Sequence, residues 1–180
     1  SLCDGMSCGQ IALTELGIKI DNYYASEIKN IAIKVTLNNF PNTIQIGDVN
    51  NITYSNGILK TEKGDFNVSF DLVIFGSPCQ SFSNMMKKEK KIGLKDKKRS
   101  GLFYECYRIL KEVNPKYFLM ENVVMNKKER DKISNLLGVE PIRINSSLVS
   151  AQSRDRLYWT NIPNTTLPQD RHIFLNDILD

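Results

Sequence analysis

The residues best able to do chemistry in this chain are a thiol, a carboxyl group and two guanidinium groups. Cys79 lies in the sequence Ser-Pro-Cys-Gln, where a proline stiffens the backbone just before the thiol. Such a thiol can act as a nucleophile, Glu121 can transfer a proton, and Arg154 and Arg156 can stabilise developing negative charge. Taken alone, Cys79 would be a small packing residue, Glu121 a helix cap and the arginines surface ion pairs. Together the four groups favour catalysis.

These groups need a scaffold that brings separate parts of the chain together. Each follows an apolar run, at residues 70–76, 117–120 and 142–149, and such runs are typical of strands. Strand-like and helix-like segments alternate along the chain, which is the pattern of an α/β fold. We expect an open, mostly parallel sheet with helices on both faces, with the reactive groups beyond its strand ends, where such folds bind ligands.

Apolar spacing and helix-breaking residues predict the remaining elements. We expect helices over 10–16, 28–40, 100–113 and 126–137, and strands over 21–25, 43–46 and 157–160. Residues 1–3 are predicted to end a further strand. The polar stretch 50–67 contains Asn-Gly and Lys-Gly-Asp, so we expect a loop or a hairpin there.

Composition limits the class of protein. A chain of 180 residues can bury the core of one domain, and it contains no apolar run long enough to span a membrane and no signal peptide. Its four cysteines form no C-x-x-C pair, and it has a single histidine, so we expect neither a metal site nor a His-dependent triad. A reducing cytoplasm is the simplest setting for these cysteines.

Basic residues are concentrated directly after Cys79. The segment 86–100 holds eight Lys or Arg residues and two acids. Such a run is often only a solvated surface, but its position favours contact with phosphates. We expect the loop 81–99, with Gly93 as a flexible point, to be mobile without a nucleic acid and to close over a substrate.

A glycine turn and two acids follow the first three predicted strands. Asp4-Gly5, with Gly9, forms a strand–turn–helix entry that lacks the G-x-G-x-x-G pattern of nicotinamide sites. Glu27 can accept from ribose hydroxyls, and Asp48 can accept from an adenine amino group. Singly, Glu27 would be a helix cap and Asp48 a turn former, but the set fits S-adenosylmethionine.

The motifs around the reactive residues resemble those of the cytosine-C5 DNA methyltransferases. The signature elements Pro-Cys-Gln, Glu-Asn-Val and Gln-x-Arg-x-Arg occur here intact and in that order, at 78–80, 121–123 and 152–156. The resemblance implies a Rossmann-like class I methyltransferase fold. It implies methyl transfer from S-adenosylmethionine to C5 of a flipped-out cytosine in DNA, through a covalent cysteine adduct at C6.

The resemblance also implies a role for each matching residue. Cys79 would attack C6, Glu121 would bond N3 and the exocyclic amine, Arg156 would donate to O2, and Arg154 would hold the flanking phosphate or order the loop. The cofactor-binding residues would be Asp4, Gly5, Met6, Gly9, Glu27, Ile28, Asp48, Val49, Gly76, Pro78 and Leu102. The DNA-binding residues would be Gln80, Ser83, Lys87, Lys88, Lys98, Arg99 and Gln152. The family often has an aromatic or bulky apolar residue after the ribose acid to cover adenine, and Ile28 occupies that place here. Its first turn commonly has Phe, for which Cys3 is a smaller substitute.

The resemblance predicts one catalytic and cofactor-binding domain over residues 1–180. On this resemblance we expect the start of the first strand and the downstream target-recognition region to lie outside this sequence, and a complementing polypeptide could carry recognition. The Asn-, Lys- and Ile-rich composition favours a bacterial or phage-infected cell, and with it a restriction–modification setting.

Three other functions stay open. One branch of the same family methylates transfer RNA with the same motifs. A methyltransferase-like module could bind partners without catalysis, although Cys79 and Glu121 are both present. A nicotinamide-dependent dehydrogenase is disfavoured by the glycine pattern.

Overall fold

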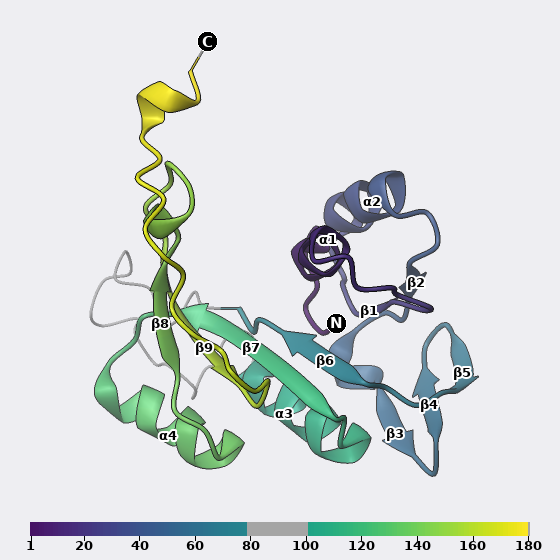
Figure 1. Cartoon of the computed structure of the whole chain (residues 1–180). Helices are drawn as coiled ribbons and strands as arrows, with labels where there is room; N and C mark the ends of the chain where they lie inside the picture. The colour runs from purple at the N-terminus through teal and green to yellow at the C-terminus, as the bar shows by residue number, and fades with distance from the viewer. Residues whose placement is uncertain (79–100, 180) are drawn as a thin grey trace.

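The computed structural model describes residues 1–78 and 101–179, and its centre is a twisted sheet built in two parts. Strands β6 (Leu72–Phe75), β7 (Tyr117–Val123), β9 (Asp155–Thr160) and β8 (Ile142–Asn145) lie side by side in that order (Figure 1). Strands β1 (Tyr24–Ala25) and β2 (Ile44–Gln45) form a second, parallel pair. Parallel bridges from Leu2 to Ser26 and to Phe75 join the two parts.

The direction of one strand matters most for the site. β6 runs parallel to β7, whereas β9 runs antiparallel to both β7 and β8. The amino end of β9 therefore lies beside the carboxyl end of β7, with Arg156 opposite Val123. A parallel sheet with one reversed strand agrees with the expected open, mostly parallel α/β sheet.

Helices lie on both faces of the sheet, as predicted. Figure 1 shows α1 (Cys8–Glu15) and α2 (Asn30–Asn39) on one side and α3 (Leu102–Val113) and α4 (Lys127–Leu137) on the other. The core lies under α3, whose buried side chains recur at helical spacing and meet the alternate, inward residues of β6 and β7. α4 begins at Asn126, whose side chain accepts from the Glu129 amide at 3.0 Å, and ends at Gly138 in the left-handed region.

The stretch 50–67 is more ordered than the predicted loop or hairpin. After a 3₁₀ turn, η1 (Val49–Asn51), it forms an antiparallel sheet of β3 (Thr53–Ser55), β4 (Ile58–Thr61) and β5 (Gly64–Asn67). Each of these short strands turns one large side chain inward, namely Tyr54, Leu59 and Phe66, while its neighbours stay largely exposed. A pattern of one inward-facing apolar residue per strand is too sparse to predict a three-stranded sheet from sequence.

Several element boundaries differ from the predictions, and three of them lie near the predicted catalytic residues. The strand expected over 117–120 continues to Val123, so Glu121 lies inside β7 and not beyond its end. The strand expected over 157–160 begins at Asp155, so Arg156 lies inside β9. The strand expected over 142–149 stops at Asn145 and gives way to a 3₁₀ turn, η4 (Ser146–Leu148).

The last described segment extends away from the sheet. Figure 1 shows the chain after β9 passing beside the β8–β9 connection, where the Arg171 amide donates to the Leu148 carbonyl at 2.8 Å. A short 3₁₀ turn, η5 (Leu175–Asp177), follows. In the described residues no helix is long and apolar enough to cross a membrane.

Candidate active site and cofactor site

Glu121 and Arg156 meet at the carboxyl end of β7. The antiparallel register pairs Glu121 with Tyr158 and Val123 with Arg156, which places the Glu121 and Arg156 side chains on the same face. The Arg156 Nε lies 2.7 Å from Glu121 Oε1, and the two side chains are 16% and 35% exposed. The Nε–H is not aimed at that oxygen, so the contact is an ion pair and not an aligned hydrogen bond. The sheet thus brings the predicted acid and arginine together.

The chain directly before Cys79 is held against this pair. A Cβ built on Gly76 would stand 3.3 Å from Glu121 Oε2, so the glycine gives the carboxylate room. Asn122 is 1% exposed, and its Nδ2 donates to both the carbonyl and the hydroxyl of Ser77 at 3.2 Å. Asn122 therefore fixes the segment that leads through Pro78 to Cys79.

Asn145 organises the connection that carries the second arginine. Its Oδ1 accepts from the amides of Ser147 and Arg154, both at 3.0 Å. The Ser146 amide donates to the Arg154 carbonyl at 3.0 Å, and the Ser146 hydroxyl donates to the Gln152 carbonyl. These bonds close the 146–154 loop on itself, while Gln152 and Arg154 stay exposed.

The predicted cofactor turn and the first predicted acid are in direct contact. The Gly5 amide donates to Glu27 Oε2 at 2.8 Å, while Glu27 Oε1 accepts from the amides of Ile28 and Lys29 at 2.8 and 2.9 Å. Gly5 has φ +63°, and nothing lies within 4 Å of the position where its Cβ would be. The backbone is therefore open at this turn, and Oε2 keeps room for a further donor.

The second acid joins the same edge of the sheet. The Ser26 hydroxyl donates to the Gly47 carbonyl at 2.8 Å, which ties the turn after β2 to the turn after β1. Asp48 Oδ1 accepts from the amide and the side chain of Asn50, at 2.9 and 2.7 Å. Within the described residues Oδ2 takes no hydrogen bond, so this oxygen can accept from a ligand.

Comparison with known proteins identifies the family. The model of the C-5 cytosine-specific DNA methylases matches residues 1–139. The chain belongs to this family.

Relatives and a solved structure agree with the family match. The chain is 35% identical to the type II methyltransferase M1.ScrFI of Lactococcus lactis subsp. cremoris over 152 residues, covering 78% of this chain and 35% of the relative. It is 39% identical to the type II methyltransferase M.NlaIV of Neisseria lactamica over 100 residues, covering 56% and 20%. A DNA modification methyltransferase encoded within an E. coli prophage superposes with a TM-score of 0.64 and 25% identity, covering 88% of this chain and 44% of that one. The chain thus spans about a fifth to a third of these two curated relatives.

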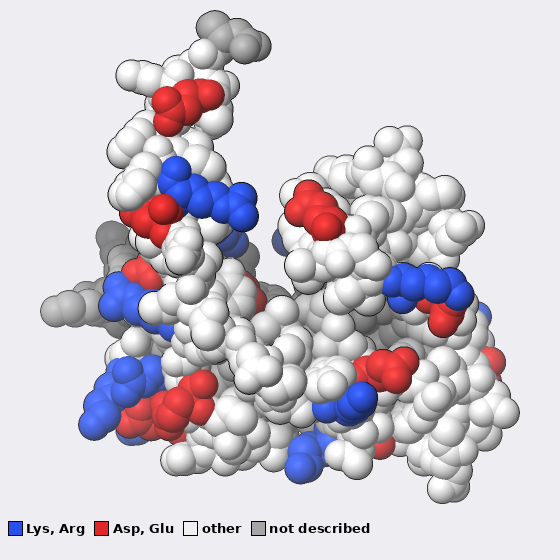
Figure 2. Space-filling model, in the orientation of Figure 1, with Lys and Arg blue, Asp and Glu red and all other residues white. Residues whose placement is uncertain are grey.

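Several predicted residues of this methylase domain lie outside the described residues. They are the predicted nucleophile Cys79 and the predicted DNA-binding residues Gln80, Ser83, Lys87, Lys88, Lys98 and Arg99. The predicted motion of the 81–99 loop falls there as well. On the face drawn in Figure 2, the described Lys and Arg side chains are scattered among acidic ones and form no single basic patch.

The remaining cofactor candidates divide into exposed and buried side chains. Met6 and Ile28 are 56% and 65% exposed at the turn, where they are free to cover a ligand. Gly9 has a different use. A Cβ at this position would stand 3.1 Å from both Ile74 and the Tyr23 hydroxyl, so the lack of a side chain lets α1 approach the sheet. Val49 is buried in the core, where only its backbone can reach a ligand, and Leu102 begins α3, which packs against η1.

Asp4 at the turn and Cys106 in α3 serve the fold. The Asp4 carboxylate accepts from the Tyr23 hydroxyl at 2.9 Å and from the Ser7 hydroxyl, so this predicted cofactor residue is occupied through its side chain. Cys106 is buried. The pKa of its thiol is raised, first by the contact with Cys3 and second by burial. A thiol with a raised pKa is a poor nucleophile at neutral pH.

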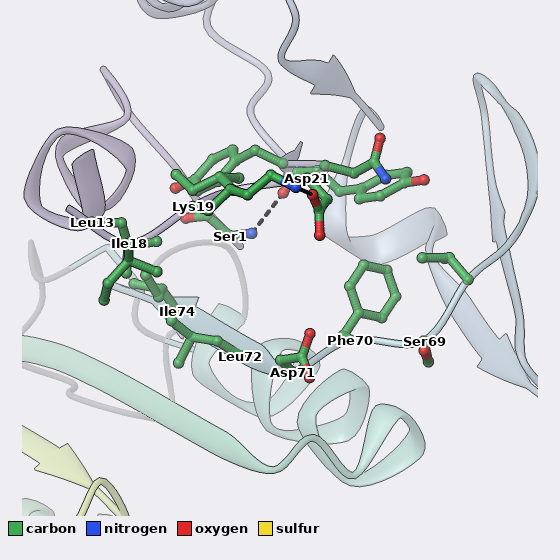
Figure 3. A pocket seen from close by; sticks show the side chains of 15 residues that line it. Ser1, Leu13, Ile18, Lys19, Asp21, Ser69, Phe70, Asp71, Leu72 and Ile74 are labelled. Carbon is green, nitrogen blue, oxygen red and sulfur yellow. Dashed lines mark hydrogen bonds and ion pairs between the residues drawn. The ribbon is translucent and has the colours of Figure 1, made fainter. Parts of the chain in front are cut away.

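A cavity lies at the opposite edge of the sheet from these residues. Its volume is about 350 Å³, and it is lined by residues 18–24 before and within β1, residues 68–72 before and within β6, and Leu13, Ile74 and Ser1 (Figure 3). The Lys19–Asp21 ion pair closes one side at 2.9 Å. No predicted site residue lines it, and ligands of open α/β folds bind at the carboxyl ends of strands, so we assign it no role. In the described residues no group of three or more His, Cys, Asp or Glu could hold a metal ion.

Proposed function

We propose that the protein transfers a methyl group from S-adenosylmethionine to C5 of a cytosine in DNA, through a covalent bond between Cys79 and C6. The observation that carries the proposal is the Glu121–Arg156 pair, held 2.7 Å apart against Gly76 in a chain of the cytosine-C5 methylase family. The match of this pair to the chemistry of a cytosine ring favours this reaction over a purely structural ion pair.

Cytosine C5 is a weak nucleophile and must be activated. The Cys79 thiolate adds to C6, so an S–C6 bond forms and the electron pair of the C5–C6 double bond moves into the ring toward N3 and O2. Glu121 gives a proton to N3, and Arg156 donates a hydrogen bond to O2. Both groups therefore act where negative charge develops. C5 becomes the carbon of an enamine, which can accept an electrophile.

S-Adenosylmethionine, when bound, supplies that electrophile as a methyl group. S-Adenosylhomocysteine remains after the methyl group has left. The C5 proton then leaves to water, the C5–C6 double bond forms again as the S–C6 bond breaks and returns the Cys79 thiolate, and N3 gives its proton back to Glu121. The target base must leave the duplex first, because C6 is inaccessible in a base stack. Gln152 and Arg154 are exposed, and Asn145 holds the backbone amide of Arg154, which supports a contact of these two side chains with the strand from which the base has been flipped.

The residues at the carboxyl ends of β1 and β2 fit the adenosyl group. The open backbone at Gly5 accommodates the methionine portion, Glu27 Oε2 has room for a ribose hydroxyl beside the Gly5 amide, and Asp48 Oδ2 can accept from the adenine amine. Ile28 and Met6 supply apolar surface nearby. This set holds and orients the cofactor.

Methyl transfer from labelled S-adenosylmethionine to duplex DNA tests the proposal. We expect 5-methylcytosine among the nucleosides of the digested DNA. The assay should use the whole polypeptide to which this chain belongs. Label in transfer RNA but not in DNA would indicate the RNA-directed branch, and binding of S-adenosylhomocysteine without transfer to either would indicate a binding module.

A further inference from the structure

Glu62 belongs to none of the family motifs, yet its carboxylate reaches the proposed adenine end of the site. Glu62 and Lys63 form the two-residue turn between β4 and β5, where Thr61 pairs with Gly64. The Thr61 hydroxyl donates to the Gly64 carbonyl at 2.9 Å and accepts from the Lys63 amide at 3.0 Å. This tight turn presents Glu62 in one position.

The Glu62 carboxylate contacts the turn of residues 47–51 at three points. Its Oε1 accepts from the Asn51 side chain, and its Oε2 lies 3.5 Å from the Asp48 amide. A Cβ on Gly47 would stand 2.7 Å from Oε2, so the carboxylate occupies the space that a side chain would take. Gly47 also has φ +83°, a conformation that favours glycine.

The position of Asp48 depends on that turn. Asn50 holds Asp48 Oδ1 through two bonds, which leaves Oδ2 as the oxygen able to accept from a ligand. Asn50 is itself part of η1, whose end at Asn51 is bonded to Glu62. Glu62 therefore contacts this segment near both ends, at Asp48 and at Asn51, while Asn50 holds Asp48 Oδ1 from within it.

We propose that Glu62 is a positioning residue for recognition of the 6-amino group of adenine. Its contacts hold residues 47–51 in place, so that Asp48 Oδ2 points in one direction; we call these contacts the clip. This inference rests on the proposed S-adenosylmethionine site. A fixed carboxylate oxygen bonds an amino group and repels a carbonyl oxygen, because two acceptors then face each other without a proton. A loosened Asp48 can turn away from the carbonyl, so removal of the clip should reduce this discrimination.

Calorimetric titration with S-adenosylhomocysteine and with S-inosylhomocysteine tests the inference. The second ligand has a 6-oxo group in place of the amine. We expect the wild-type protein to prefer the amino ligand by at least about tenfold, as sites built around a hydrogen bond reject ligands that lack it. In Glu62→Ala this preference should fall several-fold, because the amino ligand loses part of its hydrogen bond and the oxo ligand meets less repulsion.

Two further variants separate positioning from general damage. Lys63→Ala changes the other residue of the same turn, which holds its place by a backbone bond, and should keep the wild-type preference. Glu62→Gln keeps one acceptor oxygen and should give an intermediate preference. If Glu62→Ala lowers the melting temperature of the free protein, the ligand preference of Glu62→Gln is compared with that of the wild type instead.

The outcomes distinguish this inference from the proposed function. An unchanged preference in Glu62→Ala and Glu62→Gln, with both ligands weakened equally, would overturn the role of Glu62 and leave the cofactor site standing. Failure of the wild-type protein to bind S-adenosylhomocysteine would overturn the proposed function, and the role of Glu62 with it.

Discussion

The proposed catalytic pair and the proposed cofactor site lie at the same edge of the sheet but are built in different ways. Glu121 and Arg156 come from adjacent strands, and the register of β7 and β9 sets their contact. Glu27 and Asp48 follow strands, and hydrogen bonds within turns hold their carboxylates. The catalytic geometry thus depends on the sheet, whereas the cofactor geometry depends on local turns. Changes in the two regions should therefore have separable effects.

Glu121→Gln should give the largest effect on the reaction. A glutamine keeps the size of the side chain but cannot give a proton to N3, so we expect kcat to fall by roughly 10²–10⁴. The affinity for S-adenosylhomocysteine should stay unchanged, because Glu121 does not belong to the turns that hold it. Steady-state methyl transfer and calorimetry measure the two quantities. Equal losses in both would show that the two regions are not separable.

Glu27→Ala should act on the other region. Loss of its bonds to the Gly5 turn and to a ribose hydroxyl should weaken S-adenosylhomocysteine binding by about 1.5–3 kcal/mol. Glu27→Gln keeps one acceptor oxygen and serves as the matched variant. Unchanged affinity in calorimetry would remove Glu27 from the cofactor site.

Asn122→Ala should reduce stability and rate together. It leaves the buried carbonyl and hydroxyl of Ser77 without their donor, at a cost of about 1–3 kcal/mol in the free energy of unfolding. Because Ser77 leads into the Cys79 segment, kcat should fall as well. Urea unfolding and methyl transfer test both parts. The exposed Asn161→Ala, which removes bonds at the far end of β7, should lower stability and leave kcat near wild type.

Asp155→Asn should have the smallest effect, and the effect should depend on pH. Hydrogen bonding to Arg143 lowers the pKa of Asp155, so its contribution to stability is present above the unfolded-state pKa and is lost as the pH falls through the lower folded-state value. We expect a small loss of Tm near neutral pH that disappears in acid. Both groups are close to the surface, so added salt should also reduce it. A loss of Tm that persists in acid would point to packing instead.

The sequence predicts which chemical groups meet, but not how they are held. Motif order and strand ends are sufficient to bring Glu121, Arg156, Glu27 and Asp48 to one edge of an α/β sheet. The contact between Glu121 and Arg156 depends on the antiparallel register of β9, which no local pattern specifies. The alternation of β7 offers one missed signal, because Asn122 is a polar residue at a buried position.

The supporting side chains were not predictable for a related reason. Asn145 bonds a residue nine positions away in the chain, and Glu62 bonds residues 11 and 14 positions away. The sequence around each of them is that of an ordinary turn. The β3–β5 sheet that carries Glu62 has one inward apolar residue per strand, so its order depends on tertiary packing. Such contacts follow from the fold and cannot be derived from residue types alone.

The central claim is that Cys79 forms a covalent bond to the target base, and trapping with 5-fluorocytosine tests it most directly. Fluorine at C5 cannot leave as a proton does, so the thioether at C6 should remain after methyl transfer. We expect the protein to form a stable adduct with duplex DNA that carries 5-fluorocytosine at its target site. Cys79→Ser should form none, because a serine hydroxyl is a far weaker nucleophile near neutral pH. Cys8→Ser, at an exposed cysteine, should trap like the wild type. An adduct that persists in Cys79→Ser, and that mass spectrometry maps to another residue, would contradict the mechanism.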